Sequence, residues 1–261
     1  PVISEDQLPD RQMNILLLGV DDFAANGFRT DVIMLLSLNP KHNSISLVSF
    51  PRDLYVTIPG YWSNRINTVW GLGGFELLAD TFEVNFGIHP EYYMMVNYNG
   101  FRDVVNSLDG IDVVVTQELQ DSCGRDASGW CIIKPGTVHM DGDMALLYPR
   151  SRLTSSDFDR NRRAQEVVKA IFTKAMNLNM LPKVPELYGL YREYIDTNVQ
   201  LLDILPYLPL ASEVMKTGNI NQYAVGPEVV SNWITAEGAM VLIPNYYGIS
   251  EILSEALYLN E

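Results

Sequence analysis

Five arginines gather near the middle of the chain, in the stretch RSRLTSSDFDRNRRAQ: Arg150, Arg152, Arg160, Arg162 and Arg163. The protein as a whole is acidic, with a formal net charge of -14 at pH 7. A guanidinium group is planar and offers paired N–H donors, which suit the oxygens of a phosphate better than the point charge of a lysine does. The stretch therefore predicts a site for an oxyanion such as phosphate.

A helix is expected from Asp159 onward, because apolar residues recur there at helical spacing: Ala164, Val167, Val168, Ile171, Phe172 and Ala175. Steps of three and four residues put Arg160 and Arg163 on this apolar face and Arg162 on the opposite face. Cations in the first turn oppose the helix dipole by about 0.3 to 1 kcal/mol each, and a bound anion would reverse this cost. The alternative is a solvated helix start neutralised by aspartates, but inward-facing arginines favour an anion site.

Three apolar stretches near the N-terminus predict β-strands, over residues 14–20, 31–38 and 44–50. If they pair as an antiparallel meander, the end of the first, the start of the second and the end of the third share one edge of the sheet. That edge collects Asp21, Asp22, Arg29, Asp31, Arg52 and Asp53. Two carboxylates beside arginines suit a Mg²⁺ ion completed by a phosphate substrate. Aspartates are also common at strand ends without any function, so the spacing alone does not decide.

Further elements are expected along the chain from the same periodicities. We expect helices over 74–86, 100–108 and 141–148, the last ended by Pro149, and strands over 92–97 and 111–116. The apolar face of the helix over 74–86 is typical of a protein core. Beyond residue 182, short apolar segments alternate with prolines and show no chemistry of their own.

Several short motifs follow one another over residues 14–176. They are GVD (19–21), RTD (29–31), SFPRD (49–53), RIN (65–67), the pair Gly73-Gly74, HMDGDMALLYPRSR (139–152) and DFDRNRR (157–163). Together they resemble the LytR-CpsA-Psr family. Its members are membrane-anchored, extracytoplasmic phosphotransferases that move glycopolymers from a polyprenyl-pyrophosphate carrier to the cell wall.

The resemblance implies an α/β fold of three layers, α-β-α, with a mixed, largely antiparallel central sheet and a hydrophobic pocket for the lipid. We expect residues 1–12 to be a tether and residues 13–261 to form a single catalytic domain. We also expect the protein to act at the extracytoplasmic face of the cell membrane, held there by a single-pass anchor that this chain does not contain.

The resemblance also implies site residues. Asp21 and Asp31 are the metal ligands, for Mg²⁺ or Mn²⁺, and together with Arg52 and Asp53 they form the catalytic set. The candidate pyrophosphate-binding residues are Arg29, Arg52, Arg65, Arg150, Arg152, Arg160, Arg163 and Gln165. The family usually has an arginine where this chain has Phe23, a glycine at Asp159 and a glutamine at Ala164. Gln165 lies one step further on, about 100° around the helix.

The expected reaction is the transfer of a phosphate-linked glycopolymer to a hydroxyl of peptidoglycan or another wall acceptor. Arginines and a metal ion would neutralise the phosphate charge, so no nucleophilic side chain is required. Two alternatives stay open: a module that binds polyprenyl-linked glycans without turnover, and a hydrolase that removes pyrophosphate from the lipid. The acidic composition argues against nucleic acid as a partner, and no P-loop, metalloprotease or nucleophile-elbow motif occurs.

Cys123 and Cys131 are the only cysteines of the chain, and they lie in a loop rich in glycine, serine and aspartate. Their spacing matches no zinc-binding pattern, and two cysteines in an exported domain commonly form a disulfide. We therefore expect a bridge that stabilises the fold by roughly 2 to 3 kcal/mol. Mass spectrometry without reductant, on protein prepared under oxidising conditions, should detect no free thiol. Two free thiols would instead indicate a cytosolic loop.

Overall fold

The computed structural model describes residues 12–21, 29–122, 129–151, 153, 156–177 and 194–259. The chain divides into two compact units. Unit 1 comprises the described residues of Pro1–Asn97 and Asp196–Glu261, and unit 2 comprises those of Tyr98–Ile195. Each unit is described by itself below. The prediction of one catalytic domain over 13–261 stays a prediction, and residues 1–11 of the expected tether lie outside the described residues.

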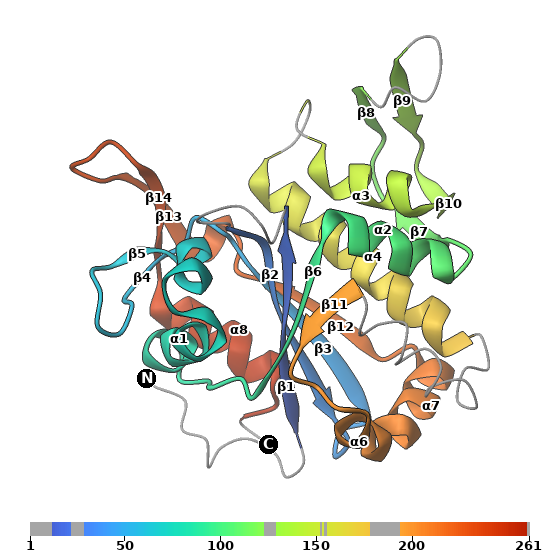
Figure 1. The fold of residues 1–261 in the computed structure, drawn as a ribbon, viewed down its shortest axis with the longest axis horizontal. Coiled ribbons are helices and arrows are strands. Elements are labelled where there is room, and N and C mark those ends of the chain that lie inside the picture. Colours follow the sequence, from blue (N-terminus) through green and yellow to red (C-terminus); the bar gives the residue numbers. More distant parts are fainter. Residues whose placement is uncertain are drawn as a thin grey trace. The chain divides into compact units, whose positions relative to one another are not determined.

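A six-stranded sheet organises unit 1, in the order β11-β6-β1-β2-β3-β12 (Figure 1). The strands are β1 (Met13–Val20), β2 (Thr30–Asn39), β3 (Ser44–Phe50), β6 (Tyr92–Asn97), β11 (Ile195–Thr197) and β12 (Ile220–Ala224). β1, β2 and β3 pair antiparallel, whereas β6 runs parallel to β1 and β12 parallel to β3. The predicted meander is confirmed, and so is a mixed central sheet flanked by helices.

The helices of unit 1 are α1 (Val69–Phe86), α6 (Leu201–Ile204), α7 (Leu208–Thr217) and α8 (Tyr246–Ala256), with short 3-10 turns at η2 (Ile66–Thr68), η4 (Leu205–Tyr207) and η5 (Pro227–Val229). α1 and α8 contact each other and pack on one face of the sheet, around Phe50, Phe82 and Leu253 (Figure 1). Two small hairpins complete the unit: β4 (Tyr55–Val56) with β5 (Asn64–Arg65), and β13 (Val230–Ile234) with β14 (Met240–Pro244).

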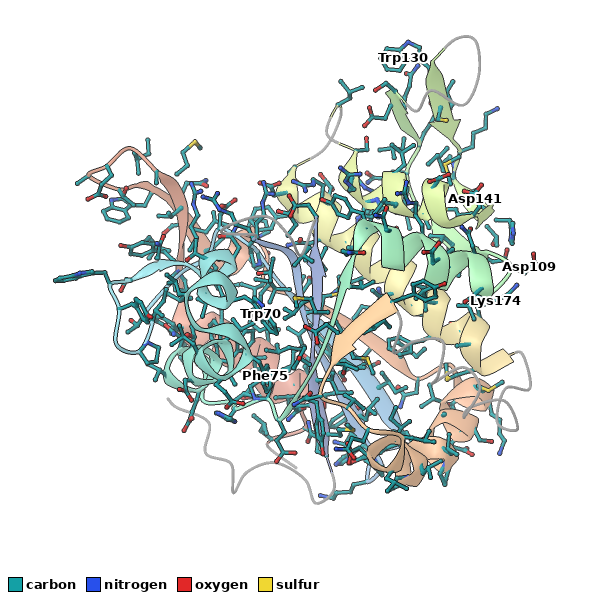
Figure 2. All side chains as sticks on the ribbon, viewed as in Figure 1. Trp70, Phe75, Asp109, Trp130, Asp141 and Lys174 are labelled. Carbon is teal, nitrogen blue, oxygen red and sulfur yellow. The ribbon has the colours of Figure 1, made fainter. Side chains whose placement is uncertain are left out.

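Helix α1 begins five residues before the predicted start at Gly74 and contains a kink. Gly73 has φ -157° and ψ 17°, and Gly74 has φ 67° and ψ -154°, a region that only glycine adopts readily. The Gly73-Gly74 motif is therefore explained by the backbone. Leu78, Phe82 and Phe86 are buried in the core, as the periodicity predicts. Phe75 is only partly buried, and its ring lies 4.9 Å from that of Tyr93, while the ring of Trp70 lies 5.1 Å from Tyr93. Figure 2 labels Trp70 and Phe75.

Unit 2 has its own hydrophobic core. It contains α2 (Tyr98–Ser107), β7 (Ile111–Val115), β8 (Leu119–Ser122), β9 (Trp130–Ile133), β10 (Gly136–Met140), α3 (Gly142–Arg150) and α4 (Asp157–Asn177). β7 pairs with β10, and Val113, Tyr148 and Val167 are among the buried residues between the helices and this ribbon. Pro149 does not end α3 as predicted. The helix continues to Arg150, because the Ser151 N–H still bonds to the Leu147 carbonyl at 3.1 Å.

Among the described residues, no helix is both long and apolar enough to cross a membrane.

Candidate functional site

Two candidate metal ligands follow directly from the pairing of β1 with β2. Asp21 comes immediately after β1 and is exposed, and Asp31 is the second residue of β2. Gly19 pairs with Val32 but Val20 pairs with Thr30, so Asp31 is an extra residue in the ladder, a β-bulge. A bulge re-aims the side chain that it carries. Arg29 is exposed just before β2, and Asp22 lies outside the described residues.

The SFPRD motif forms a tight turn at the end of β3. The Leu54 N–H bonds to the Pro51 carbonyl at 3.1 Å, so Arg52 and Asp53 are the two central residues of the turn. The Arg52 carbonyl accepts a 3.2 Å bond from the N–H of Asn67, in the RIN motif. Two motifs separated in the sequence therefore fix the backbone from which Arg52 and Asp53 project.

Four charged side chains of unit 1 form a chain of ion pairs, which we call the strand-end cluster: Asp31, Arg52, Asp53 and Arg65. Arg52 Nη1 lies 2.7 Å from Asp31 Oδ1, and Arg52 Nε lies 3.6 Å from Asp53 Oδ2. Arg65 Nε lies 3.2 Å from Asp53 Oδ1. About a quarter of each side chain is exposed. Alternating carboxylates hold the two guanidinium groups in place, which is the pre-organisation that recognition of a phosphate requires.

Arg65 has a second anchor, on the β13–β14 hairpin. Its Nε and Nη2 both donate to the carbonyl oxygen of Met240, at 3.1 and 2.6 Å. The anchor is a backbone atom, so it does not depend on the Met240 side chain, which is 67% exposed. A second bond, from the Leu242 N–H to the Asp53 carbonyl at 3.0 Å, also holds the hairpin beside the cluster.

The oxygen atoms at the strand ends fit a hard divalent cation. Asp21 and Asp31 offer carboxylates at adjacent strand ends, and Mg²⁺ and Mn²⁺ prefer such ligands. The amide oxygen of the buried Asn67 has no hydrogen-bond partner among the described residues. A buried acceptor of this kind is rare in proteins and suits a donor supplied from outside, such as a metal-bound water or a substrate hydroxyl. The residues present therefore fit a metal ion that keeps several waters.

Unit 2 carries the predicted arginine helix, α4. Arg163 is only 4% exposed, and its Nη2 donates to the Ser151 carbonyl at 2.9 Å. Its guanidinium also lies over the ring of Tyr148, 5.8 Å from the centroid. Burial lowers the pKa of Arg163 below its ordinary value, because the charged form loses hydration. The prediction that this arginine faces inward is confirmed.

Arg160 also lies on the inward side, with 14% of its side chain exposed. Its Nη1 forms a 2.6 Å ion pair with Asp157 Oδ1, one turn earlier. Its Nε is buried and has no acceptor among the described residues. A buried charged donor without an acceptor favours an anion as its partner.

Arg162, predicted to lie on the face opposite Arg160 and Arg163, has partners of its own within unit 2. Its Nη1 lies 2.5 Å from Glu166 Oε1 and donates to Thr116 Oγ1 at 2.7 Å. Glu166 Oε2 in turn accepts a 2.7 Å bond from the Tyr148 hydroxyl. Burial, followed by this bond to Glu166, raises the pKa of Tyr148 well above its usual range. Arg162 is therefore a structural residue that ties α4 to the core of unit 2.

Arg150, at the end of α3, is exposed and lies over an aromatic ring. Its guanidinium carbon is 4.2 Å from the centroid of Tyr98, the first residue of α2. Such a cation–π contact limits the rotamers of a long side chain while leaving its N–H donors accessible. Gln165 is buried on α4, and Arg152 lies outside the described residues. Cys123 also lies outside them, so the predicted disulfide with Cys131 stays a prediction.

Comparisons with known proteins show which family the sequence is related to. The model of the LytR_cpsA_psr family matches residues 3–252. This chain belongs to that family. It is 33% identical over 193 residues to the regulatory protein MsrR of Staphylococcus aureus (strain COL), covering 73% of this chain and 57% of MsrR. The chain thus spans little more than half the length of that relative.

Two further similarities connect the LytR-CpsA-Psr domain to transferases. It is 30% identical over 213 residues to TagT of Bacillus subtilis (strain 168), named a polyisoprenyl-teichoic acid–peptidoglycan teichoic acid transferase, covering 79% of this chain and 66% of TagT. The solved structure of TagT bound to LIIa-WTA superposes with a TM-score of 0.76 at 26% identity, covering 95% of this chain and 91% of that one. The resemblance and the fold class predicted from the motifs are both confirmed.

Some residues around the site of this LytR-CpsA-Psr domain were not expected from its sequence. Glu166 stands four residues after Arg162, and in a helix this spacing predicts an ion pair. Tyr98 follows directly on β6 and carries no comparable signal. The Met240 carbonyl that holds Arg65 is 175 residues away along the chain, and no side-chain pattern marks a backbone acceptor.

The start of α4 gives a testable dependence on pH. Asp159 Oδ2 accepts bonds from both the N–H and the hydroxyl of Ser156, at 2.9 and 2.8 Å, which caps the helix. These bonds lower the pKa of Asp159 below its ordinary value of 3.8. The ionised carboxylate therefore stabilises the folded protein above pH 3.8, and this stabilisation is lost as the pH falls through the folded-state pKa.

We expect Asp159→Asn to lower the free energy of unfolding at pH 7 by about 0.5 to 1 kcal/mol. The difference from the wild type should disappear in strong acid, where the wild-type carboxyl is protonated too. Urea unfolding of both proteins across this pH range measures it, and a difference that persists unchanged in strong acid would contradict the assignment.

Proposed function

We propose that this LytR-CpsA-Psr domain is a phosphotransferase that moves a glycopolymer from a polyprenyl-pyrophosphate carrier to a hydroxyl of peptidoglycan or another wall acceptor. The observation that carries the proposal is the chain of ion pairs from Asp31 through Arg52 and Asp53 to Arg65, at the strand ends of a domain of this family. The name of TagT, which states a transfer to peptidoglycan, supports it. The site of action would be the extracytoplasmic face of the cell membrane.

The reaction transfers the phosphate that carries the sugar. The oxygen of the acceptor hydroxyl attacks the sugar-linked phosphorus, and a new P–O bond forms. The bond from that phosphorus to the bridging oxygen breaks, and the bridging oxygen leaves with its electron pair as part of polyprenyl phosphate. The hydroxyl proton leaves to solvent water. The product is a phosphodiester between glycopolymer and acceptor, so no covalent intermediate on the protein is needed.

The arginines lower the barrier by neutralising charge on the phosphate oxygens. Arg52 and Arg65 are fixed by the carboxylates of Asp31 and Asp53, so they lose little freedom when they bind an anion. The Nε of Arg160 is a buried donor without an acceptor among the described residues, and the guanidinium of Arg163 is a buried charge. Arg150, steadied by Tyr98, offers an exposed guanidinium. The resemblance to the family assigns each of these arginines to pyrophosphate recognition.

Asp21 and Asp31 would hold the metal ion, Mg²⁺ or Mn²⁺. When bound, such an ion supplies further positive charge beside the phosphate oxygens and polarises the P–O bonds. Asp53 is a positioning residue, because both of its carboxylate oxygens lie beside guanidinium groups. The polyprenyl chain needs an apolar surface, for which the partly buried aromatic residues Trp70, Phe75 and Tyr93 of unit 1 are candidates.

A reconstitution tests the proposal. The protein is incubated with a saccharide linked to polyprenyl pyrophosphate, Mg²⁺ and peptidoglycan, and the products are separated by chromatography and mass spectrometry. We expect polyprenyl phosphate to be released and the saccharide to become phosphate-linked to the wall polymer. Tight lipid binding without any release would identify a binding module instead. Release that is never accompanied by attachment, even with acceptor present, would identify a hydrolase.

A further inference from the structure

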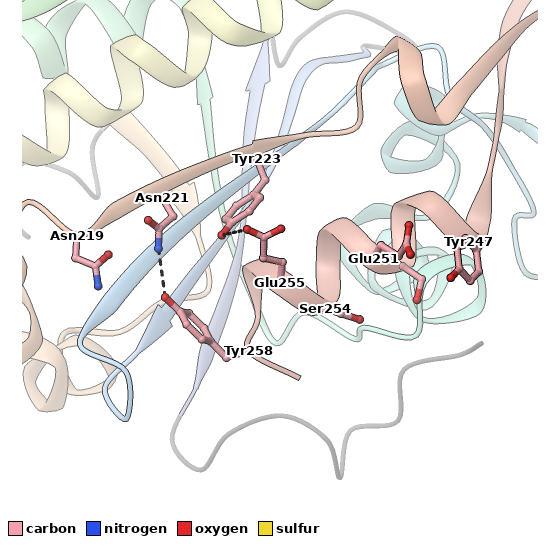
Figure 3. A pocket seen from close by; sticks show the side chains of 9 residues that line it. Asn219, Asn221, Tyr223, Tyr247, Glu251, Ser254, Glu255 and Tyr258 are labelled. Atoms are coloured by element: carbon pink, nitrogen blue, oxygen red, sulfur yellow. Dashed lines mark hydrogen bonds between the residues drawn. The ribbon is translucent and has the colours of Figure 1, made fainter. Parts of the chain in front are cut away.

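A groove of about 620 Å³ lies in unit 1 between β12 and α8, and the mechanism above does not use it (Figure 3). On the β12 side it is lined by Asn219, just before the strand, and by Asn221 and Tyr223, which alternate along the strand and so project from the same face of the sheet. β12 is an edge strand of the sheet, which leaves this side of the groove open to a long ligand.

The α8 side of the groove is a stripe along one face of the helix. It consists of Tyr247, Ser250, Glu251, Ser254 and Glu255, spaced by three and four residues, and Tyr258 follows just beyond the end of α8 at Ala256. The helical part extends about 12 Å at a rise of 1.5 Å per residue. The opposite face of the helix, with Ile249, Leu253 and Ala256, is buried in the core. A solvated helix face explains the serines and glutamates, but it does not explain the three tyrosines that line the same groove.

The ring of Tyr258 is held in place against the preference of its own backbone. Its φ is 55°, in the left-handed region, at the position after a helix where glycine is the usual residue. The ring stacks on His42 with centroids 4.3 Å apart and planes 5° from parallel. Its hydroxyl accepts a bond from Asn221 Nδ2 at 3.3 Å (Figure 3). The structure thus fixes an aromatic ring at one end of the groove where a glycine would be easier.

Polar groups accompany the rings along the groove. The hydroxyl of Tyr223 donates to Glu255 Oε1 at 3.4 Å, which crosses the groove from β12 to α8. Tyr247, at the other end, is 66% exposed and interacts with Glu251. Among the described residues that line the groove there are amides, hydroxyls and carboxylates but no lysine or arginine. Two carboxylates without a cation repel phosphate-rich or carboxylate-rich polymers.

These features of the groove suit a ligand that has apolar faces, many hydroxyl and amide groups, and no negative charge. The C–H face of a sugar ring packs on an aromatic ring, and its hydroxyls and N-acetyl groups pair with amides and carboxylates. We propose that the groove binds a neutral glycan strand built of N-acetylhexosamine units. This inference rests on the proposed transfer reaction, in which the groove is a docking site for the glycan backbone of the acceptor. The anionic glycopolymer and its pyrophosphate are excluded by charge.

The first experiment measures binding to the full chain by calorimetry, with a neutral oligosaccharide of N-acetylglucosamine as the probe. We expect saturable binding by the wild type. Tyr247→Ala should weaken it by about threefold to tenfold, the effect of losing one aromatic contact. Asn221→Ala should weaken it similarly. Tyr61→Ala is the matched control, because Tyr61 is another exposed tyrosine of unit 1, 53% exposed, outside the groove. It should bind like the wild type.

Three results would overturn the assignment. The first is no saturable binding by the wild type, and the second is an equal loss in the Tyr61→Ala control. The third is preferential binding of a de-N-acetylated, cationic oligosaccharide or of a lysine-rich peptide, since the glutamates would then be the recognition element. In that case Glu255→Gln would abolish binding, whereas a neutral glycan should bind this variant with a change of at most about threefold.

A second measurement separates this inference from the proposed function. In the transfer assay, Tyr247→Ala should raise the peptidoglycan concentration needed for half-maximal rate by about threefold to tenfold and leave kcat unchanged, since the change removes uniform binding. Oligosaccharide binding by a wild type that transfers nothing would contradict the transferase proposal and leave the groove assignment standing. Transfer by a wild type that binds no oligosaccharide would contradict the groove assignment alone.

Discussion

Asp31→Ala is expected to lower the rate of metal-dependent transfer by about 10²- to 10³-fold, the effect typical of removing one pre-organised electrostatic group from an active site. The change removes a carboxylate assigned to the metal and also the 2.7 Å partner of Arg52. Asp21→Ala should lose metal binding as well, because both carboxylates are assigned to the same ion. The rate is measured as polyprenyl phosphate released, and metal affinity by Mn²⁺ titration followed by electron paramagnetic resonance.

The control for this prediction is Asp143→Ala on α3. Asp143 Oδ1 lies 3.2 Å from Arg102 Nη1, so this variant also removes a carboxylate paired with an arginine, but outside the strand-end cluster. It should keep wild-type turnover and Mn²⁺ affinity at the candidate site. Thermal unfolding should show that all three variants are folded. Full metal-dependent activity in both Asp21→Ala and Asp31→Ala would show that the metal assignment is wrong.

The second large effect is expected from the arginines of α4. Arg160→Ala and Arg163→Ala should each weaken binding of a short polyprenyl pyrophosphate by about 10- to 150-fold, which corresponds to 1.5 to 3 kcal/mol for a charge-assisted contact. Arg162→Ala should leave this affinity nearly unchanged. It should instead lower the free energy of unfolding by about 0.5 to 1 kcal/mol, because it removes the contacts to Glu166 and Thr116.

Conservative variants show whether a loss of affinity in this series comes from misfolding. Arg163 is almost fully buried, so its alanine variant is compared with Arg163→Lys, which keeps the charge but loses the planar pair of donors. Arg160 is partly exposed and its alanine variant should fold normally. Affinity comes from calorimetry and stability from urea unfolding of the same samples. Equal losses of affinity at all three positions would contradict the assignment of the arginines to separate faces of the helix.

The N-terminal strands could be predicted from the sequence to within one residue, and the reason is physical. β1, β2 and β3 are buried on both faces, so their apolar runs are continuous and end where charged or turn residues begin. Once these strands were paired as a meander, the meeting of Asp31 with Arg52 followed from topology. Helical periodicity likewise predicts that Arg163 faces inward.

What the sequence did not reveal depends on non-local contacts and on backbone shape. The bulge at Asp31 is a shift in pairing between β1 and β2, and no residue type specifies it. The early start of α1 was missed because Gly73 and Gly74 are usually helix breakers, whereas here they kink a helix that continues. The partners of Arg162 and the ring beneath Arg150 come from distant segments.

The anchoring of Arg65 to a main-chain oxygen has a consequence for how this domain can evolve. Substitutions at Met240 leave the carbonyl in place, so the residue type there is free to drift. Ile234 pairs with Met240, so a shift of one residue in the pairing of the two strands would place a different carbonyl under Arg65 and reverse the alternation of the hairpin. Among descendants of this sequence, the hairpin should therefore vary in residue type and keep its strand register.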